Sequence, residues 1–405
     1  MRDATNAEGD DIVITGMART PFGSSQGQLS CLSAPTLGSY AIKQALKLSQ
    51  IAAHDVSEVF MGNVLEAGLG QAPARQAALH AGIPVSVPCT TINKVCGSGM
   101  QSIIFGIQAL LLDRAKVVVS GGMENMSLAP FLLEDARKNF SIGNHILIDS
   151  MIHDGLWDAY VHKHMGSCAE ACAEKYQFTR QMQDNYAALS YRRAQQAQQE
   201  GLLSREIVPV VIKKKDGTTL SMAHDEGPDR FNFEKMQKLK PAFEKTGTIT
   251  AANSSSINDG AAAVVLMRAS TAKRQGIQPL GKIVAYDGYA HDPTWFTTAP
   301  IHAMEKALSR AGWKIDDVDL FEVNEAFAVV ALAAQQALKI PIEKYNIWGG
   351  AIAYGHPIGA SAARLVITLL SQLNTLGKKK GLASICIGGG EALAICVESM
   401  GGKAW

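Results

Sequence analysis

A cysteine and a histidine stand at glycine-rich turns that could support nucleophilic catalysis. Cys96 is followed by Gly-Ser-Gly and then by the apolar run 102–112, which predicts a thiol at the start of a helix. There the unpaired backbone N–H groups and the positive end of the helix dipole lower the pKa of a thiol and favour the thiolate. His356, in the turn 349–361, could accept the thiol proton. The pair predicts thiolate attack on a carbonyl, with N–H groups at the glycines holding the negative oxygen.

Two further residues extend this chemistry. Cys386 ends an apolar strand beside three glycines and could move a proton on carbon. Asn324 follows the apolar run 320–323 and could fix a water or a carbonyl oxygen. Each residue alone has an ordinary structural explanation: a packed core thiol, a turn asparagine or, for His356, a helix cap. Their joint occurrence in a duplicated framework favours the catalytic interpretation.

Short β-branched runs alternate with amphipathic segments along the chain. Residues 11–15 and 116–120 are expected to form strands, and residues 37–48 have helical periodicity. Strands that alternate with helices predict an α/β fold.

The sequence also repeats itself over a long interval. Cys96-Gly-Ser-Gly99 resembles His356-Pro-Ile-Gly359, which follows it by 260 residues, and 118–124 resembles 385–391, which follows it by 267. A nearly constant offset indicates a duplicated α/β unit. Cys96 and His356 then occupy equivalent helix starts, and two halves packed face to face would bring both to one central site.

Three regions follow from this pattern. Residues 1–127 together with 258–278 form a predicted N-terminal half, and 279–405 form the C-terminal half. The intervening residues 128–257 are richer in charged, His, Met and Gln residues, and we interpret them as a loop domain that covers the site. This loop domain should contain a helix over 180–201 and a hairpin that turns at Asp216-Gly217.

The composition excludes several function classes. The 405 residues carry a formal net charge of +1, which gives no electrostatic reason to expect nucleic acid or an acidic membrane as a partner. No apolar stretch approaches the length of a membrane span. The seven cysteines are scattered and contain no Cys-x-x-Cys pair, so neither a disulfide framework nor a metal site is expected. The acidic N-terminus has neither signal nor transit character, so the cytoplasm is the expected location.

Four motifs together resemble the thiolase family over essentially the whole chain from Ile12. They are the Cys-Gly-Ser-Gly turn at Cys96, the Asn-Glu-Ala-Phe box at Asn324, the Gly-His-Pro-Ile-Gly-Ala-Ser box at His356 and the Cys-Ile-Gly-Gly-Gly segment at Cys386. The resemblance implies duplicated α/β halves in a layered α/β/α/β/α core with an inserted loop domain.

The resemblance also implies a reaction without a cofactor, in which coenzyme A is substrate and product. Cys96 would carry an acyl group as a thioester, His356 would activate it, and Cys386 would exchange a proton with the α-carbon of acetyl-CoA. One oxyanion hole would use His356 and a water held by Asn324, and the other the N–H groups of Cys96 and Gly388. Acetyl-CoA, acetoacetyl-CoA and CoA would be the partners, and the enzyme would be a homodimer or homotetramer.

Substrate-binding residues are likewise implied by the resemblance. Ser255 would contact the pantetheine arm, and Arg230 and Lys235 the adenosine phosphates. Phe243 and Phe327 would wall a narrow acyl pocket, and His164 and Met165 would lie over the acyl and pantetheine ends. Ala326 is a further expected substrate-binding residue.

Two positions depart from the family pattern, and three alternatives stay open. Ala362 replaces a common glycine, and Glu391 follows the third glycine where methionine is common; an unpaired Glu391 would disfavour a Cys386 thiolate. The segment around His164 favours a short-chain acetyl-CoA C-acetyltransferase. A medium- or long-chain 3-ketoacyl-CoA thiolase is the nearest alternative, and Cys386 with Asn324 disfavours a decarboxylating condensing enzyme. A catalytically silent acyl-CoA or lipid carrier is the alternative from another class.

Overall fold

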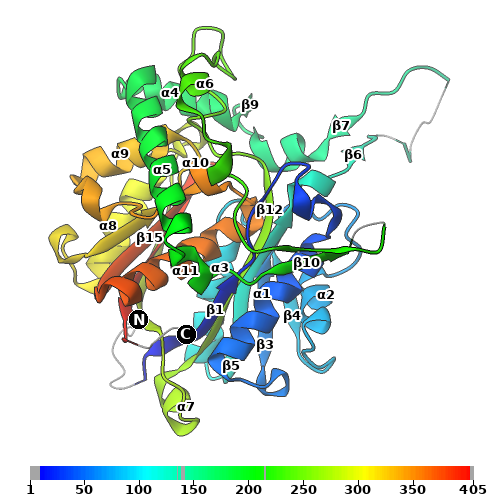
Figure 1. Cartoon of the computed structure of the whole chain (residues 1–405), viewed down its shortest axis with the longest axis vertical. Coiled ribbons are helices and arrows are strands. Elements are labelled where there is room, and N and C mark those ends of the chain that lie inside the picture. The colour runs from blue at the N-terminus through cyan, green and yellow to red at the C-terminus, as the bar shows by residue number, and fades with distance from the viewer. Residues whose placement is uncertain (1–9, 135, 138–141, 214–215, 402–405) are drawn as a thin grey trace.

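The computed structural model describes residues 10–134, 136–137, 142–213 and 216–401, and in this part of the chain the main sheet has ten strands (Figure 1). Its strand order is β14-β15-β16-β13-β1-β12-β5-β3-β4, with the short β2 beside β12. The bounds are β1 (Ile12–Arg19), β2 (Gly23–Ser24), β3 (Glu58–Gly62), β4 (Cys89–Ile92), β5 (Val117–Asn125), β12 (Asn258–Arg268), β13 (Gly281–Ala290), β14 (Leu320–Val323), β15 (Lys380–Ile387) and β16 (Glu391–Ser399).

Two half-sheets meet at β1 and β13. They share only two residue pairs, Val13 with Lys282 and Ile14 with Gly281, so the halves diverge beyond this contact. β12 follows the inserted region in sequence and returns to pair with both β1 and β5 in the first half. In each half the parallel pairs adjoin antiparallel strands, which makes a mixed sheet.

Helices cover both half-sheets and fill the space between them. α1 packs on β1 and β12, α8 packs on β13 and β16, and α11 contacts both β5 and β15 from between the halves. This arrangement confirms the predicted α/β fold. The helix bounds are α1 (Ala34–Ser49), α2 (Pro73–His80), α3 (Ser98–Leu111), α4 (Met165–Lys175), α5 (Arg180–Gln199), α6 (Phe233–Gln237), α7 (Ala269–Arg274), α8 (Ala299–Ala311), α9 (Ala328–Leu338), α10 (Ala351–Tyr354) and α11 (Ile358–Leu376).

The predicted equivalence of the two catalytic turns has a structural counterpart. Cys96 lies two residues before α3, which begins at Ser98, and His356 lies two residues before α11, which begins at Ile358. Small residues let these two helices approach each other. A Cβ on Gly99 would lie 2.9 Å from the backbone nitrogen of Ala363, so glycine is required where α3 crosses α11.

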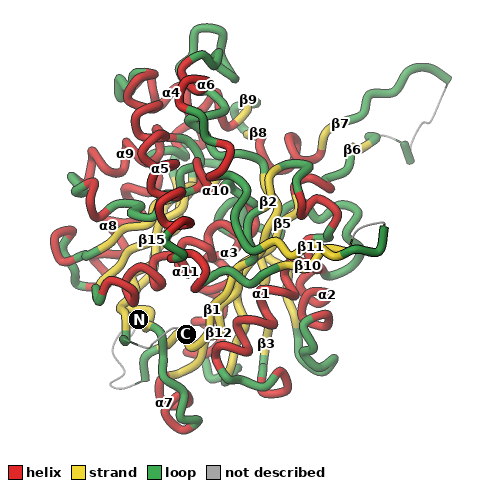
Figure 2. Tube along the Cα trace, viewed as in Figure 1, coloured by secondary structure: helices red, strands yellow, loops and turns green. Residues whose placement is uncertain are grey.

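The inserted region holds most of the remaining elements, and Figure 2 shows helices and long loops over one end of the sheet. The expected helix is α5, and the expected hairpin pairs β10 with β11, although residues 214–215 of its turn lie outside the described residues. β6 and β7 lie on an arm that projects from the body (Figure 1). The small strands are β6 (Phe131–Leu132), β7 (Ile148–Asp149), β8 (Trp157–Asp158), β9 (Lys163–His164), β10 (Val210–Lys213) and β11 (Thr219–Met222).

Candidate active site

The turn before α3 presents the Cys96 thiol to a backbone N–H group from the other half of the chain. The sulfur accepts a hydrogen bond from the N–H of Gly388, which follows β15. Burial nevertheless raises the pKa of Cys96 to about 11, and the charge of Glu124 adds to this. The expectation of a lowered thiol pKa at the helix start is therefore wrong for the resting protein, because loss of hydration outweighs the N–H groups.

His356 is held as a neutral base whose Nε2 lies beside Asn324. Ser361 Oγ donates to the carbonyl of Pro357 at 2.8 Å, so its lone pair accepts from His356 Nδ1 at 2.6 Å. The proton therefore lies on Nδ1, which leaves the lone pair on Nε2. Burial, helped by the positive charge of Arg364, lowers the pKa of His356 to about 3. The imidazole is uncharged at neutral pH and can accept a thiol proton.

Asn324 lies next to this base. The residue is fully buried, and its Nδ2 lies 3.5 Å from His356 Nε2. Its backbone N–H donates to the carbonyl of Ser384 in β15, which fixes its position at the end of β14. Asn324 Oδ1 is a buried acceptor without a hydrogen-bond partner among the described residues. It can therefore accept a hydrogen bond from a water or from a substrate N–H or O–H group.

The Cys386 thiol lies close to that of Cys96. Burial raises the pKa of Cys386 well above its usual range, and a negative charge on Cys96 would raise it further. The N–H of Ala326 donates to the Cys386 sulfur and opposes this effect. Both thiols are consequently neutral at rest, and Cys386 is suited to give a proton to a carbanion.

The comparisons with known proteins agree with this arrangement. The family model described as the thiolase N-terminal domain matches residues 12–270, and the thiolase C-terminal domain matches residues 277–399. The chain belongs to the thiolase family. Acetyl-CoA acetyltransferase 2 of Arabidopsis thaliana is 50% identical over 390 residues, covering 96% of this thiolase and 97% of the relative. Acetyl-CoA acetyltransferase of Cupriavidus necator is 48% identical over 389 residues, covering 96% and 99%.

The predicted substrate pocket brings three aromatic rings together. His164 stacks on Phe243 with ring centroids 4.8 Å apart, and Phe243 meets the edge of Phe327 at 6.0 Å. His164 also caps α4, because its Nδ1 accepts from the N–H of Gly166. Met165 lies over Gly388, since a Cβ on that glycine would be 3.3 Å from the Met165 sulfur. These side chains therefore pack together, with Met165 next to Gly388, and their role as walls of an acyl pocket stays a prediction.

Ser255 and Ala326, two further predicted substrate contacts, are hydrogen-bonded to each other. The N–H and the hydroxyl of Ser255 both donate to the carbonyl of Ala326, at 2.9 and 3.0 Å. Because the N–H of Ala326 bonds the Cys386 sulfur, Ser255 is linked through one residue to the second thiol. Their contacts with substrate stay predictions.

The structure does not place the two residues predicted to contact the adenosine phosphates, Arg230 and Lys235, beside the Cys96 and Cys386 thiols. Arg230 has a side chain that is 59% exposed and lies 3.7 Å from the Glu226 carboxylate. Lys235 is exposed on α6, whose start is capped by Asn232. Both lie in the inserted region, and their role toward the adenosine phosphates stays a prediction.

A buried carboxylate to which the sequence pattern assigned no role binds the backbone next to the His356 turn. Glu124, at the end of β5, accepts from Gly359 N–H at 2.9 Å and from the N–H groups of Val64 and Leu65 at 3.1 Å. Asn63 Nδ2 donates to it at 2.7 Å. Burial raises the pKa of Glu124 to about 7 against these donors. The only sequence signal for it was its place in the duplicated segment 118–124.

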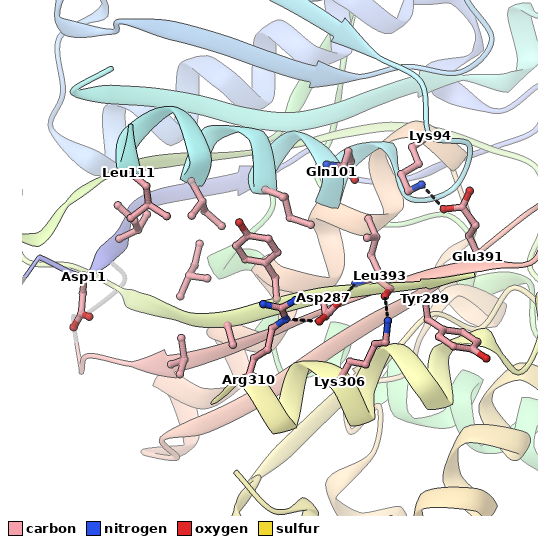
Figure 3. Close-up of a pocket in the computed structure, with 18 of the residues that line it drawn as sticks. Asp11, Lys94, Gln101, Leu111, Asp287, Tyr289, Lys306, Arg310, Glu391 and Leu393 are labelled. Carbon is pink, nitrogen blue, oxygen red and sulfur yellow. Dashed lines mark hydrogen bonds and ion pairs between the residues drawn. The ribbon is translucent and has the colours of Figure 1, made fainter. Parts of the chain in front are cut away.

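The Glu391 carboxylate is paired, which removes the concern that it disfavours a Cys386 thiolate. It binds the Lys94 ammonium at one end of a cavity of about 850 Å³ that also lies along α3, β13 and α8 (Figure 3). Cys96, Asn324, His356 and Cys386 do not line this cavity. The other departure, Ala362, is fully buried in the core between the half-sheets.

The described part of the chain offers neither a cluster suited to a metal ion nor a helix suited to crossing a membrane. No group of three or more His, Cys, Asp or Glu side chains is arranged to hold a metal ion there. Among its helices, none combines the length and the apolar character that crossing a membrane requires.

Proposed function

We propose that this thiolase is an acetyl-CoA C-acetyltransferase, which interconverts two acetyl-CoA with acetoacetyl-CoA and CoA. The proposal is carried by the proximity of the Cys96 and Cys386 thiols, together with the Asn324–His356 contact and the close approach of the two helix starts at Gly99 and Gly359. Relatives at 45–50% identity that bear this name support the activity. The contacts among the rings of His164, Phe243 and Phe327 favour a short acyl group, because closely packed rings leave little room for a longer chain.

In the cleavage direction, the Cys96 thiol gives its proton to His356 Nε2 as its sulfur attacks the keto carbon of acetoacetyl-CoA. The N–H groups of Cys96 and Gly388 receive the negative oxygen, a contribution of about 3 kcal/mol for one good donor. The carbon–carbon bond then breaks, and the departing carbanion takes the proton of Cys386. Acetyl-CoA leaves, with an acetyl thioester on Cys96.

In the second half-reaction, CoA gives its thiol proton to the Cys386 thiolate and attacks the acetyl thioester. The Cys96 sulfur leaves and recovers its proton from His356, so both thiols return to their neutral state. Condensation is the reverse sequence. Asn324 stabilises the enolate oxygen through a water that its Oδ1 orients, as its unpartnered acceptor suggests. Neither direction needs a cofactor, because CoA is itself substrate and product.

The proposal extends to the cellular setting. Acetoacetyl-CoA chemistry belongs to lipid metabolism, and we place the enzyme in the reducing cytoplasm because the mechanism requires Cys96 and Cys386 as free thiols. Arg230 and Lys235 contact the adenosine phosphates, for which their cationic side chains are suited.

The protein assembles as a homodimer or homotetramer. β4 is an edge strand, and the arm of β6 and β7 exposes apolar side chains, including 63% of Phe131 and 83% of Ile146. A second copy would cover such surfaces.

Trapping the acetyl-enzyme tests the function. Intact mass after mixing with acetyl-CoA should show one added acetyl group on the wild-type chain and none on Cys96→Ser. Thiolysis of 3-ketoacyl-CoA substrates should be fastest with four carbons. Rising activity toward eight carbons would assign the enzyme to the longer-chain thiolases, and an unlabelled Cys96 would contradict the mechanism. Sedimentation of wild type and Ile146→Asp tests the assembly, which the substitution should weaken.

A further inference from the structure

The turn that presents Cys96 is conformationally strained. Val95, directly before the nucleophile, has a φ of 46°, in the left-handed region that a β-branched residue strongly disfavours. Such a conformation persists only where surrounding contacts hold it. Inside the turn, Asn93 Oδ1 accepts from the N–H of Val95 at 3.0 Å, and Ser98 Oγ donates to the carbonyl of Val95 at 2.6 Å.

Two contacts hold the turn from outside. One is the hydrogen bond from the N–H of Gly388 to the Cys96 sulfur. The other is the ion pair between Lys94 and Glu391, which Figure 3 shows bridging the loop before α3 and the start of β16. Both contacts join the Cys96 turn to the segment 388–391, so both set the distance between these two parts of the chain.

Glu391 has a rigid foundation from which to act. It is the first residue of β16, and its backbone pairs with Ala290 on one side and Ile387 on the other. The adjacent Gly390 packs closely against His291, the residue that follows β13, because a Cβ on Gly390 would lie 2.5 Å from the carbonyl oxygen of His291. The carboxylate is therefore a fixed point to which the flexible Lys94 side chain can be tied.

The duplication supplies an independent argument. In the repeat, segment 385–391 corresponds to 118–124, so Glu391 is the counterpart of Glu124. Glu124, from the first half, holds the N–H of Gly359 beside the His356 turn of the second half. Glu391, from the second half, holds Lys94 beside the Cys96 turn of the first half. Each half thus contributes a carboxylate that fixes the other half's catalytic turn.

We propose that Lys94 and Glu391 are positioning residues for the thiolase reaction, which hold the Cys96 turn at the distance from Gly388 at which both N–H groups of the oxyanion hole meet one oxygen. This inference rests on the proposed function. Both side chains are partly exposed, at 27% and 39%, so the pair adds little to global stability. Its effect falls on the rate, because a misplacement of about 1 Å can lower a rate by up to about 100-fold.

The test compares the rate of Cys96 acetylation by acetyl-CoA in wild type, Glu391→Gln and Lys94→Met. Partial loosening should lower the maximal acetylation rate about tenfold, with half-saturation by acetyl-CoA changed less than twofold. Exchanging the charges, with Lys94→Glu and Glu391→Lys together, should restore most of the rate. Lys94→Arg, which preserves the pair, should stay near wild type.

Glu398→Gln is the control, because Glu398 also forms a partly exposed ion pair from β16, with Lys282 at 3.4 Å, away from the site. Equal acetylation rates in Glu391→Gln and Glu398→Gln would overturn the inference. A slow Glu391→Gln that the charge exchange does not rescue would assign the effect to the carboxylate alone and would also overturn it. Failure of wild type to be acetylated would instead refute the proposed function.

Discussion

Replacement of Ser361 by alanine tests whether the imidazole tautomer limits catalysis. Ser361 Oγ is buried and lies 2.6 Å from His356 Nδ1, whose proton it accepts. Without the hydroxyl, that proton has no partner in a buried site, which costs about 1–3 kcal/mol. The penalty grows when His356 becomes positively charged in the transition state, because the charged ring is the stronger donor. Only this additional penalty slows the reaction, and it is about 1–1.5 kcal/mol, the difference between hydrogen bonds to charged and to neutral groups, so the acetylation rate should fall about 5- to 12-fold.

The assay is rapid mixing with acetyl-CoA, acid quenching and intact mass of the acetylated chain over time. Ser371→Ala is a matched control on the same helix, because Ser371 is buried and its hydroxyl has no hydrogen-bond partner among the described residues. Ser361→Ala should unfold at a lower denaturant concentration than Ser371→Ala, because it leaves a buried N–H without a partner, and only Ser361→Ala should acetylate slowly while still folded. If Ser361→Ala reacts within twofold of the control, the assignment of the Nδ1 proton has no catalytic consequence and the reasoning fails.

Three other predictions follow from the same geometry. Cys386→Ala should still accept an acetyl group on Cys96 but should form no acetoacetyl-CoA; equal loss of both steps would contradict the division of roles. Phe243→Ala should raise activity with six-carbon relative to four-carbon substrate by about tenfold, measured by thiolysis, since it removes one wall of the pocket. The folded pKa of His356 is about 3 against a usual 6.5, so below pH 6.5 only the unfolded chain gains its proton and stability falls as pH drops. In urea unfolding at pH 7 and pH 5, wild type should therefore lose more stability on acidification than His356→Asn, by up to about 1.4 kcal/mol per pH unit; parallel losses would show that His356 is not the linked group.

The duplicated framework could be predicted because local sequence determines it. The glycine-rich turns and the aliphatic runs after Cys96 and His356 specify helix starts, and the constant offset specifies that they are equivalent. Short-range patterns therefore sufficed to predict the α/β fold and to select the residues that the structure gathers into one site.

Effects that depend on burial could not be predicted in this way. A helix start favours a thiolate, but the fold removes much of the water around Cys96, and the desolvation that raises its pKa has no short-range sequence pattern. The contacts of Glu124 have the same character, because its partners are 59 or more residues away in sequence. Likewise, Lys94 and Glu391 are separated by 297 residues, and only the folded chain shows that they neutralise each other.

The return of β12 to the first half has a consequence for dissection of the protein. Because β12 lies between β1 and β5, a fragment that ends at residue 127 would lack an internal strand of its own half-sheet and would expose two unpaired edges. The first half is therefore not a module that can be cut out at residue 127, before the inserted region. Fragment complementation should succeed only when the break falls after β12, where the second fragment begins with a complete half-sheet, and a genetic fusion or permutation of this enzyme should respect that junction.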